Sequence, residues 1–180
     1  QRMAHMIEDL LDVTRIRHAG GLALQLGPAH MQTLVQRTLD EVATSHPERP
    51  IDSTLAGDLA GTWDAERLCQ VITNLVGNAL HHGSADHPVR IAVDGTRPEE
   101  VSITVSNGGT IPAGLLPHLF DPFRGGEREP GRHQGLGLGL FIAHQIVRAH
   151  HGTIEARSHN DVTSFRVTLP RHAPPRPSRG

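Results

Sequence analysis

Three carboxamide side chains recur every four residues in one segment of the chain. They are Gln70, Asn74 and Asn78, and residues at this spacing lie on the same face of a helix. A neighbouring apolar face is formed by Leu68, Val71, Ile72, Leu75 and Ala79. Because a buried amide without a partner costs about 1 to 3 kcal/mol, we expect the amide face to lie against water or a polar ligand.

Two glycine-containing turns indicate what that ligand is. Asn107-Gly108-Gly109 follows a strand-like run, and residues 135–140 (GLGLGL) lead into a helical pattern. Glycines allow a ligand to approach the backbone N–H groups closely, and the start of a helix favours phosphate. An amide-bearing helix together with two glycine turns predicts a nucleotide-binding site.

The composition excludes several classes of protein. All 17 basic residues are arginine, which excludes the lysine-dependent P-loop and eukaryotic-type protein kinase mechanisms. A formal net charge of −2 and few aromatic residues argue against a nucleic-acid partner. The histidine pairs 81–82 and 150–151 match no metal-binding motif, so they are interpreted as surface residues and no transition-metal site is assigned. Cys69 is alone and no apolar run reaches the ~20 residues of a membrane span, which together point to the cytoplasm.

The hydrophobic pattern divides the chain into three parts. Residues 1–20 are predicted to be the end of a bundle-forming helix, with apolar side chains at helical spacing at Met3, Met6, Ile7, Leu10, Leu11 and Val13. Residues 21–170 are predicted to form one compact domain. Residues 171–180 are rich in Pro and Arg and are predicted to be a disordered, solvated tail.

Helical and alternating patterns are mixed within the compact domain. Helices are predicted within residues 31–45, 65–82 (capped by Asp64) and 138–149. Strands are predicted at residues 22–26, 51–55, 89–93, 101–105, 153–157 and 163–169, including two hairpins. The polar, aperiodic segment 124–134 is predicted to be a mobile loop. The order of elements lacks regular βαβ alternation, so it favours an α+β two-layer sandwich in which helices cover one face of a mixed sheet.

Four motifs, taken together, resemble those of the catalytic and ATP-binding domain of bacterial sensor histidine kinases, a branch of the Bergerat-fold ATPases. Residues 74–79 (NLVGNA) resemble the N box, 107–112 (NGGTIP) the first glycine box, 119–123 (LFDPF) the F box and 135–140 the second glycine box. Residues 1–19 are similar to the end of the second helix of the preceding dimerisation and phosphotransfer domain. The resemblance covers about residues 28 to 170 and implies a Bergerat-type ATP-binding fold.

The resemblance implies a role for individual residues. Asn74 and Asn78 are the candidate catalytic residues, and Asn78 is the candidate Mg²⁺ ligand. Asn107 stands where the family has an Asp that accepts a hydrogen bond from the adenine amino group, and its carbonyl can accept that bond without charge. The other candidate ATP contacts are His81, His82, Gly109, Ile111, Phe120, Phe123, Arg128, Arg132, Gly135, Leu136, Gly137, Leu138 and Gly139.

The resemblance also implies a reaction. ATP-hydrolysing relatives place a glutamate base four residues before the N-box asparagine, but here that residue is Asn74, which cannot take a proton at neutral pH. We therefore interpret the chain as the ATP-binding half of an ATP:protein-histidine phosphotransferase that uses Mg²⁺ and relays phosphate to a response regulator receiver domain. A homodimer through the bundle helix is expected, with a membrane reached only through segments upstream of Gln1. The alternative, suggested by Asn107 and His81, is a degenerate, non-enzymatic dimerisation and nucleotide-sensing module.

Overall fold

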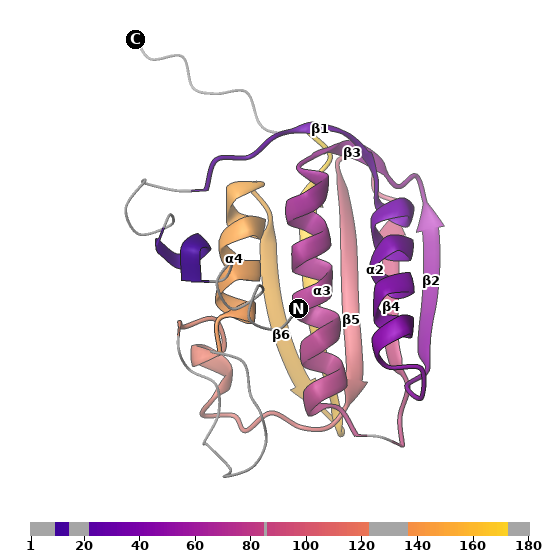
Figure 1. The fold of residues 1–180 in the computed structure, drawn as a ribbon, viewed down its shortest axis with the longest axis vertical. Coiled ribbons are helices and arrows are strands. Elements are labelled where there is room, and N and C mark those ends of the chain that lie inside the picture. The colour runs from indigo at the N-terminus through magenta and orange to yellow at the C-terminus, as the bar shows by residue number, and fades with distance from the viewer. Residues whose placement is uncertain (1–9, 15–21, 85, 123–136, 173–180) are drawn as a thin grey trace.

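A five-stranded mixed sheet forms the centre of the molecule (Figure 1). The computed structural model describes residues 10–14, 22–84, 86–122 and 137–172. The strands lie in the order β2-β4-β5-β7-β6, formed by Ile51–Gly57, Val89–Gly95, Glu100–Gly108, Val162–Pro170 and Thr153–His159. β2 and β4 are parallel, and the other neighbours are antiparallel, which confirms both predicted hairpins and the mixed sheet.

Three helices cover one face of this sheet in Figure 1, and they are α2 (Met31–Ser45), α3 (Ala65–His82) and α4 (Gly139–Ala149). Strand β4 shows why only one face is covered, since Val89, Ile91 and Val93 are buried while the residues between them are exposed. The buried residues of α3 and α4 join this face in one hydrophobic core. The predicted α+β two-layer fold is therefore confirmed.

A small second sheet was not predicted from the sequence. It pairs β1 (Gly27–His30) with β3 (Ala60–Trp63) in antiparallel register. The predicted strand at residues 22–26 is wrong, because these residues have no strand partner. The backbone N–H of Gln25 donates instead to the Asp64 carboxylate at 2.8 Å, and Leu26 is half exposed. Alternating apolar residues do not make a strand where no neighbouring strand supplies the hydrogen bonds.

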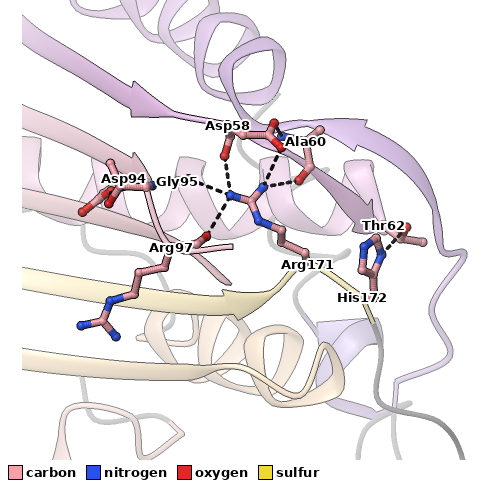
Figure 2. A network of polar contacts seen from close by, with 9 residues as sticks. Asp58, Ala60, Thr62, Asp94, Gly95, Arg97, Arg171 and His172 are labelled. Carbon is pink, nitrogen blue, oxygen red and sulfur yellow. Dashed lines mark hydrogen bonds and ion pairs between the residues drawn. The ribbon is translucent and has the colours of Figure 1, made fainter. Parts of the chain in front are cut away.

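Arg171 lies in the folded domain and not in a solvated tail, so the tail prediction is wrong at this residue. Its side chain is buried, and the guanidinium reaches the backbone carbonyls of Asp58, Ala60, Gly95 and Arg97 (Figure 2). Four carbonyl acceptors around one guanidinium match its fixed fork of N–H donors. The composition of the segment gave no sign of these contacts, because the acceptors are backbone atoms. Residues 173–180 lie outside the described ranges.

Two other predicted segments, the bundle helix and the loop at residues 124–134, lie partly or wholly outside the described residues. Residues 10–14 are the described part of the predicted bundle helix, and they are helical. A single 3-10 turn, Leu116–His118, precedes the predicted loop at residues 124–134, which lies outside the described ranges. None of the helices in the described residues is both long enough and apolar enough to span a lipid bilayer.

Candidate nucleotide-binding site

The three amides of α3 share one face of the helix but have different partners. Gln70 donates through Nε2 to the carboxylate of Asp12 at 3.0 Å. Asn74 donates through Nδ2 to the carbonyl of Gly139 at 3.0 Å. Asn78 is half-buried, and its side chain makes no hydrogen bond to any residue that the structure describes. Asn78 is therefore the member of the amide face that remains open to a ligand.

Asn107, at the end of β5, has a carboxamide oxygen without a hydrogen-bond partner among the described residues. The residue is 5% exposed, and its Nδ2 donates to the carbonyl of Gly108 at 2.9 Å. Its Oδ1 is buried and accepts no hydrogen bond in the described structure. A buried acceptor without a partner is unfavourable in the free protein, and a ligand N–H donor would satisfy it.

Residues from the β6–β7 hairpin hold the first glycine turn in place. Gly109 has a φ of +124°, its N–H donates to the carbonyl of Asp161, and its own carbonyl accepts from the Thr163 hydroxyl. The N–H of Ile111 donates to the Ser158 hydroxyl at 2.8 Å. Asp161, Thr163 and Ser158 were not predicted as site residues. Asn160 and Asp161 both have positive φ, and this Asn-Asp pair between two alternating runs is the sequence signal that could have located the turn.

The end of α3 lies against the same turn. The N–H of Ser84 donates to the carbonyl of Gly108 at 2.9 Å. A Cβ on Gly83 would lie 2.3 Å from the carbonyl oxygen of Ala79 and 3.0 Å from the Cβ of Asn107, so glycine is required at this close approach. His81 and His82, which precede this contact, are exposed, and their rings meet edge to face with centroids 4.7 Å apart.

The second glycine turn leads into α4. Gly137 has a φ of +68°, a conformation that favours glycine, and Leu138 is buried at the N-cap of the helix. The bond from Asn74 to Gly139 fixes the first turn of α4 against α3. The backbone N–H groups at the start of this 11-residue helix can bind phosphate, since they have no partner within the helix.

Phe120 connects the predicted F box to the core. Its ring stacks on His144 of α4 with centroids 5.3 Å apart and meets Phe165 of β7 edge to face. Burial, assisted by the charge of Arg148, lowers the pKa of His144 and favours its neutral form. Among the predicted ATP contacts, Phe123, Arg128, Arg132, Gly135 and Leu136 lie outside the described residues.

Together these contacts place the open amide of Asn78, the unpartnered Oδ1 of Asn107 and the two glycine turns next to α3. Asn78 lies between Asn74, which contacts α4, and Gly83, which contacts Asn107. The arrangement therefore suits a ligand that has an N–H donor at one end and an anionic group at the other.

Comparison with known proteins gives a family and a fold. The sequence model of the family described as "Histidine kinase-, DNA gyrase B-, and HSP90-like ATPase" matches residues 63–173. The chain is 37% identical over 177 residues to the probable sensor histidine kinase TcrY of Mycobacterium tuberculosis, covering 94% of this chain and 36% of TcrY. It is 30% identical over 171 residues to a bacteriophytochrome of Pseudomonas aeruginosa, covering 94% of this chain and 23% of that protein. The chain thus spans about a third or less of these two relatives.

A solved structure shares the fold. The histidine kinase ThkA, in complex with the response regulator protein TrrA, superimposes with a TM-score of 0.75 at 21% identity. The match covers 94% of this chain and 47% of that one. At this level of identity the likeness concerns the fold.

Proposed function

Because the chain belongs to the family of histidine kinase-, DNA gyrase B- and HSP90-like ATPases, we propose that it is the ATP-binding catalytic part of a two-component sensor histidine kinase. The observation that carries this proposal is the buried, unpartnered Oδ1 of Asn107. It offers an acceptor to a neutral N–H donor, and the amino group of adenine is such a donor. The bond from Nδ2 of Asn107 to Gly108 engages the nitrogen and leaves the oxygen as the group that can accept a further hydrogen bond.

The triphosphate is proposed to bind between Asn78 and the start of α4. Mg²⁺ prefers oxygen ligands in an octahedron and keeps several waters, so the open carboxamide of Asn78 with phosphate oxygens is a suitable ligand set. When bound, Mg²⁺ neutralises charge on the phosphates. Gly137 and Gly139 allow phosphate to approach the N–H groups of α4, and exposed His81 and His82 are candidates for further contacts with the phosphates.

Phosphotransfer fits these residues better than hydrolysis of ATP. A hydrolase needs a base to activate water, whereas Asn74 has no basic group and its amide is bound to Gly139. In transfer to histidine, a bond forms between an imidazole nitrogen and the γ-phosphorus, the bond to the bridging oxygen breaks, and ADP leaves. Such a reaction depends mainly on positioning and charge neutralisation, and Asn74 contributes by fixing the first turn of α4.

Partners and location follow from the same proposal. The acceptor histidine belongs to a dimerisation domain, and residues 1–19 are proposed to be the end of its second helix in a homodimer. The phosphate would pass on to a response regulator receiver domain, and the ThkA–TrrA complex is a solved structure that contains such a pair. The ATP-binding part is proposed to act in the cytoplasm.

Isothermal titration with Mg²⁺ and a non-hydrolysable ATP analogue tests the site. Asn107→Leu removes the acceptor at nearly constant volume and should weaken binding by about five- to 150-fold, the equivalent of 1 to 3 kcal/mol. Asn78→Ala should weaken binding by about tenfold or more, and only when Mg²⁺ is present. Gln36→Ala, at an exposed amide on α2 that bonds to Asp40, is the matched control. Unchanged affinity in both site variants would refute the proposed site.

A further inference from the structure

Phe120 contacts one aromatic ring on α4 and another on β7. Its ring is inclined by 21° to that of His144 on α4, and the two centroids are 5.3 Å apart. It meets the fully buried ring of Phe165 on β7 at 80°, with centroids 6.4 Å apart. Of these three rings, only the imidazole can take up a proton. Within this cluster, a change in pH therefore acts through His144.

The chain between the first glycine turn and Phe120 connects the two ends of the proposed nucleotide site. Near the turn, the N–H of Ile111 donates to the Ser158 hydroxyl at 2.8 Å, which fixes this end to β6. At the other end, the stack on His144 fixes Phe120 to α4, the helix whose start is the proposed phosphate site. We call residues 115–122 the F-box segment. Release of Phe120 from α4 would free one end of this connection while the end at Ile111 stays bound.

The surroundings of the stack favour a neutral His144. Burial lowers the pKa of His144, and the positive charge of Arg148, one turn further along α4, has the same effect. Among the charged groups that the structure describes, on α3, β6, β7 and the F-box segment as well as on α4, only Arg148 contributes to this effect. His118 and Asp121, the titratable residues of the F-box segment, contact each other at 2.9 Å. Because Phe120 covers one face of the imidazole, part of the burial comes from the stack itself.

We propose that neutral His144 is a positioning residue for nucleotide binding, because its stack on Phe120 holds the F-box segment against α4, and that protonation of His144 releases this segment. The effect on the nucleotide rests on the proposed function. Since the stack favours the neutral ring, it is fully formed above the ordinary histidine pKa of about 6.5 and is lost as the pH falls below that value. Coupling is reciprocal, so proton uptake and nucleotide binding oppose each other by the same factor.

Titration with Mg²⁺ and a non-hydrolysable ATP analogue at pH 7.5 and 5.5 tests the effect on binding. The wild type should lose about two- to tenfold more affinity at the lower pH than His144→Phe, which keeps an aromatic ring but cannot be protonated. This comparison removes the contributions of the nucleotide's own phosphates and of the other histidines. His144→Ala, which removes the ring, should bind about two- to tenfold more weakly than the wild type at pH 7.5. His46→Gln, at an exposed histidine after α2, is the matched control and should keep the pH dependence of the wild type.

Nuclear magnetic resonance tests the stack without nucleotide. The ring proton signal of His144 is assigned by its loss in His144→Phe. In the wild type this signal should titrate at a lower pH than in Phe120→Ala, where water reaches the ring. Fluorescence of buried Trp63 shows that each protein is folded at both pH values.

Several results would contradict the proposal. Equal losses of affinity in the wild type and in His144→Phe would refute the role of His144 in binding. A smaller loss in the wild type would show that cation–π attraction between the imidazolium and Phe120 outweighs burial, which overturns the proposed direction. Titration of His144 at the same pH with and without the Phe120 ring would refute the link between protonation and the stack. If the wild type does not bind the analogue at either pH, the proposed function is refuted, and the resonance titration still decides whether protonation and the stack are linked.

Discussion

The two side chains that define the proposed nucleotide site, those of Asn78 and Asn107, carry no charge. Asn78 and Asn107 offer amide oxygens, and neither changes its charge between acidic and basic pH. Binding through these two residues should therefore depend little on pH. Outside these two residues, pH affects the molecule most clearly at a buried histidine that lies between two helices.

His150 is buried, so its interpretation as a surface residue is wrong, and it joins the end of α4 to the start of α3. Its Nε2 accepts from the N–H of Asp64 at 3.0 Å, and its Nδ1 lies 2.9 Å from the carbonyl of Ile146. These partners require a neutral ring with its proton on Nδ1. Burial lowers the pKa of His150 and outweighs the opposing effects of the Ile146 carbonyl and the Asp64 carboxylate.

We predict that this histidine makes stability depend on pH. Because the folded pKa is lower than the unfolded value of about 6.5, the contribution is fully present above that pH and is lost as pH falls towards the folded pKa. His150→Gln keeps an acceptor near the position of Nε2 but cannot be protonated. Urea unfolding at pH 7.5 and 5.5, followed by Trp63 fluorescence, should show a smaller loss of stability in His150→Gln than in the wild type. Equal losses would contradict the prediction.

At the scale of the elements, the segment after β7 packs against β3 and against the turns that contain residues 58–60 and 95–97. Besides its guanidinium contacts (Figure 2), Arg171 donates its backbone N–H to Glu99 and accepts from the N–H of Thr62. Gly95 is part of this cluster, and a Cβ there would lie 1.8 Å from the carbonyl of Asp58. One buried guanidinium thus links residues 58–60 and 95–97 to the segment after β7, three parts of the chain that are far apart in sequence.

We predict that Arg171→Met destabilises the fold by about 3 kcal/mol, because several buried carbonyls lose a charged donor. Arg171→Lys should recover only part of this loss, since an ammonium group lacks the planar fork of N–H donors. Arg157→Met on β6 is the control, because that arginine is 79% exposed and its ion pair with Glu155 should contribute little. Urea unfolding measures all three variants. Equal stability of Arg171→Met and Arg157→Met would show that the cluster is not important for stability.

Elements with a long hydrophobic repeat were predictable, and short elements were not. The 18 residues of α3 give a clear helical period and an Asp64 cap, whose side chain accepts from the N–H of Arg67. β1 and β3 have only four residues each and contain glycine, so their own sequences carry almost no strand signal. The same limit applies to Arg171, because its backbone acceptors leave no pattern in the sequence.

At the scale of the whole molecule, the fold decides which of the predicted site residues are available. The spacing of Gln70, Asn74 and Asn78 predicted a shared face and motif resemblance predicted a nucleotide, but neither could predict that two of the amides are already bound. Their partners, Asp12 and Gly139, are 58 and 65 residues away in sequence. Contacts between such distant residues depend on how the layers pack, which a local pattern does not contain.

The arrangement of the histidines in the whole molecule leads to the last prediction, which concerns phosphotransfer. We expect that the chain does not label itself with phosphate but labels an added fragment that carries a phosphoacceptor helix. Among the described histidines, both ring nitrogens of His150 are engaged and His144 stacks on Phe120. His81 and His82 are exposed but lie on the helix that carries the proposed Mg²⁺ ligand, where they are suited to contact phosphate and not to receive it.

Radiolabelled ATP and Mg²⁺ test this with and without the added fragment. Acid-labile label on the fragment, and none on the chain, is the expected result, because phosphohistidine hydrolyses in acid. Asn78→Ala should abolish the label, which separates transfer by this site from a contaminating kinase. Label on the chain alone would place the acceptor within it and contradict the proposed division between acceptor helix and ATP-binding part. If the wild type binds the ATP analogue yet labels neither component, the non-enzymatic nucleotide-sensing module becomes the better interpretation.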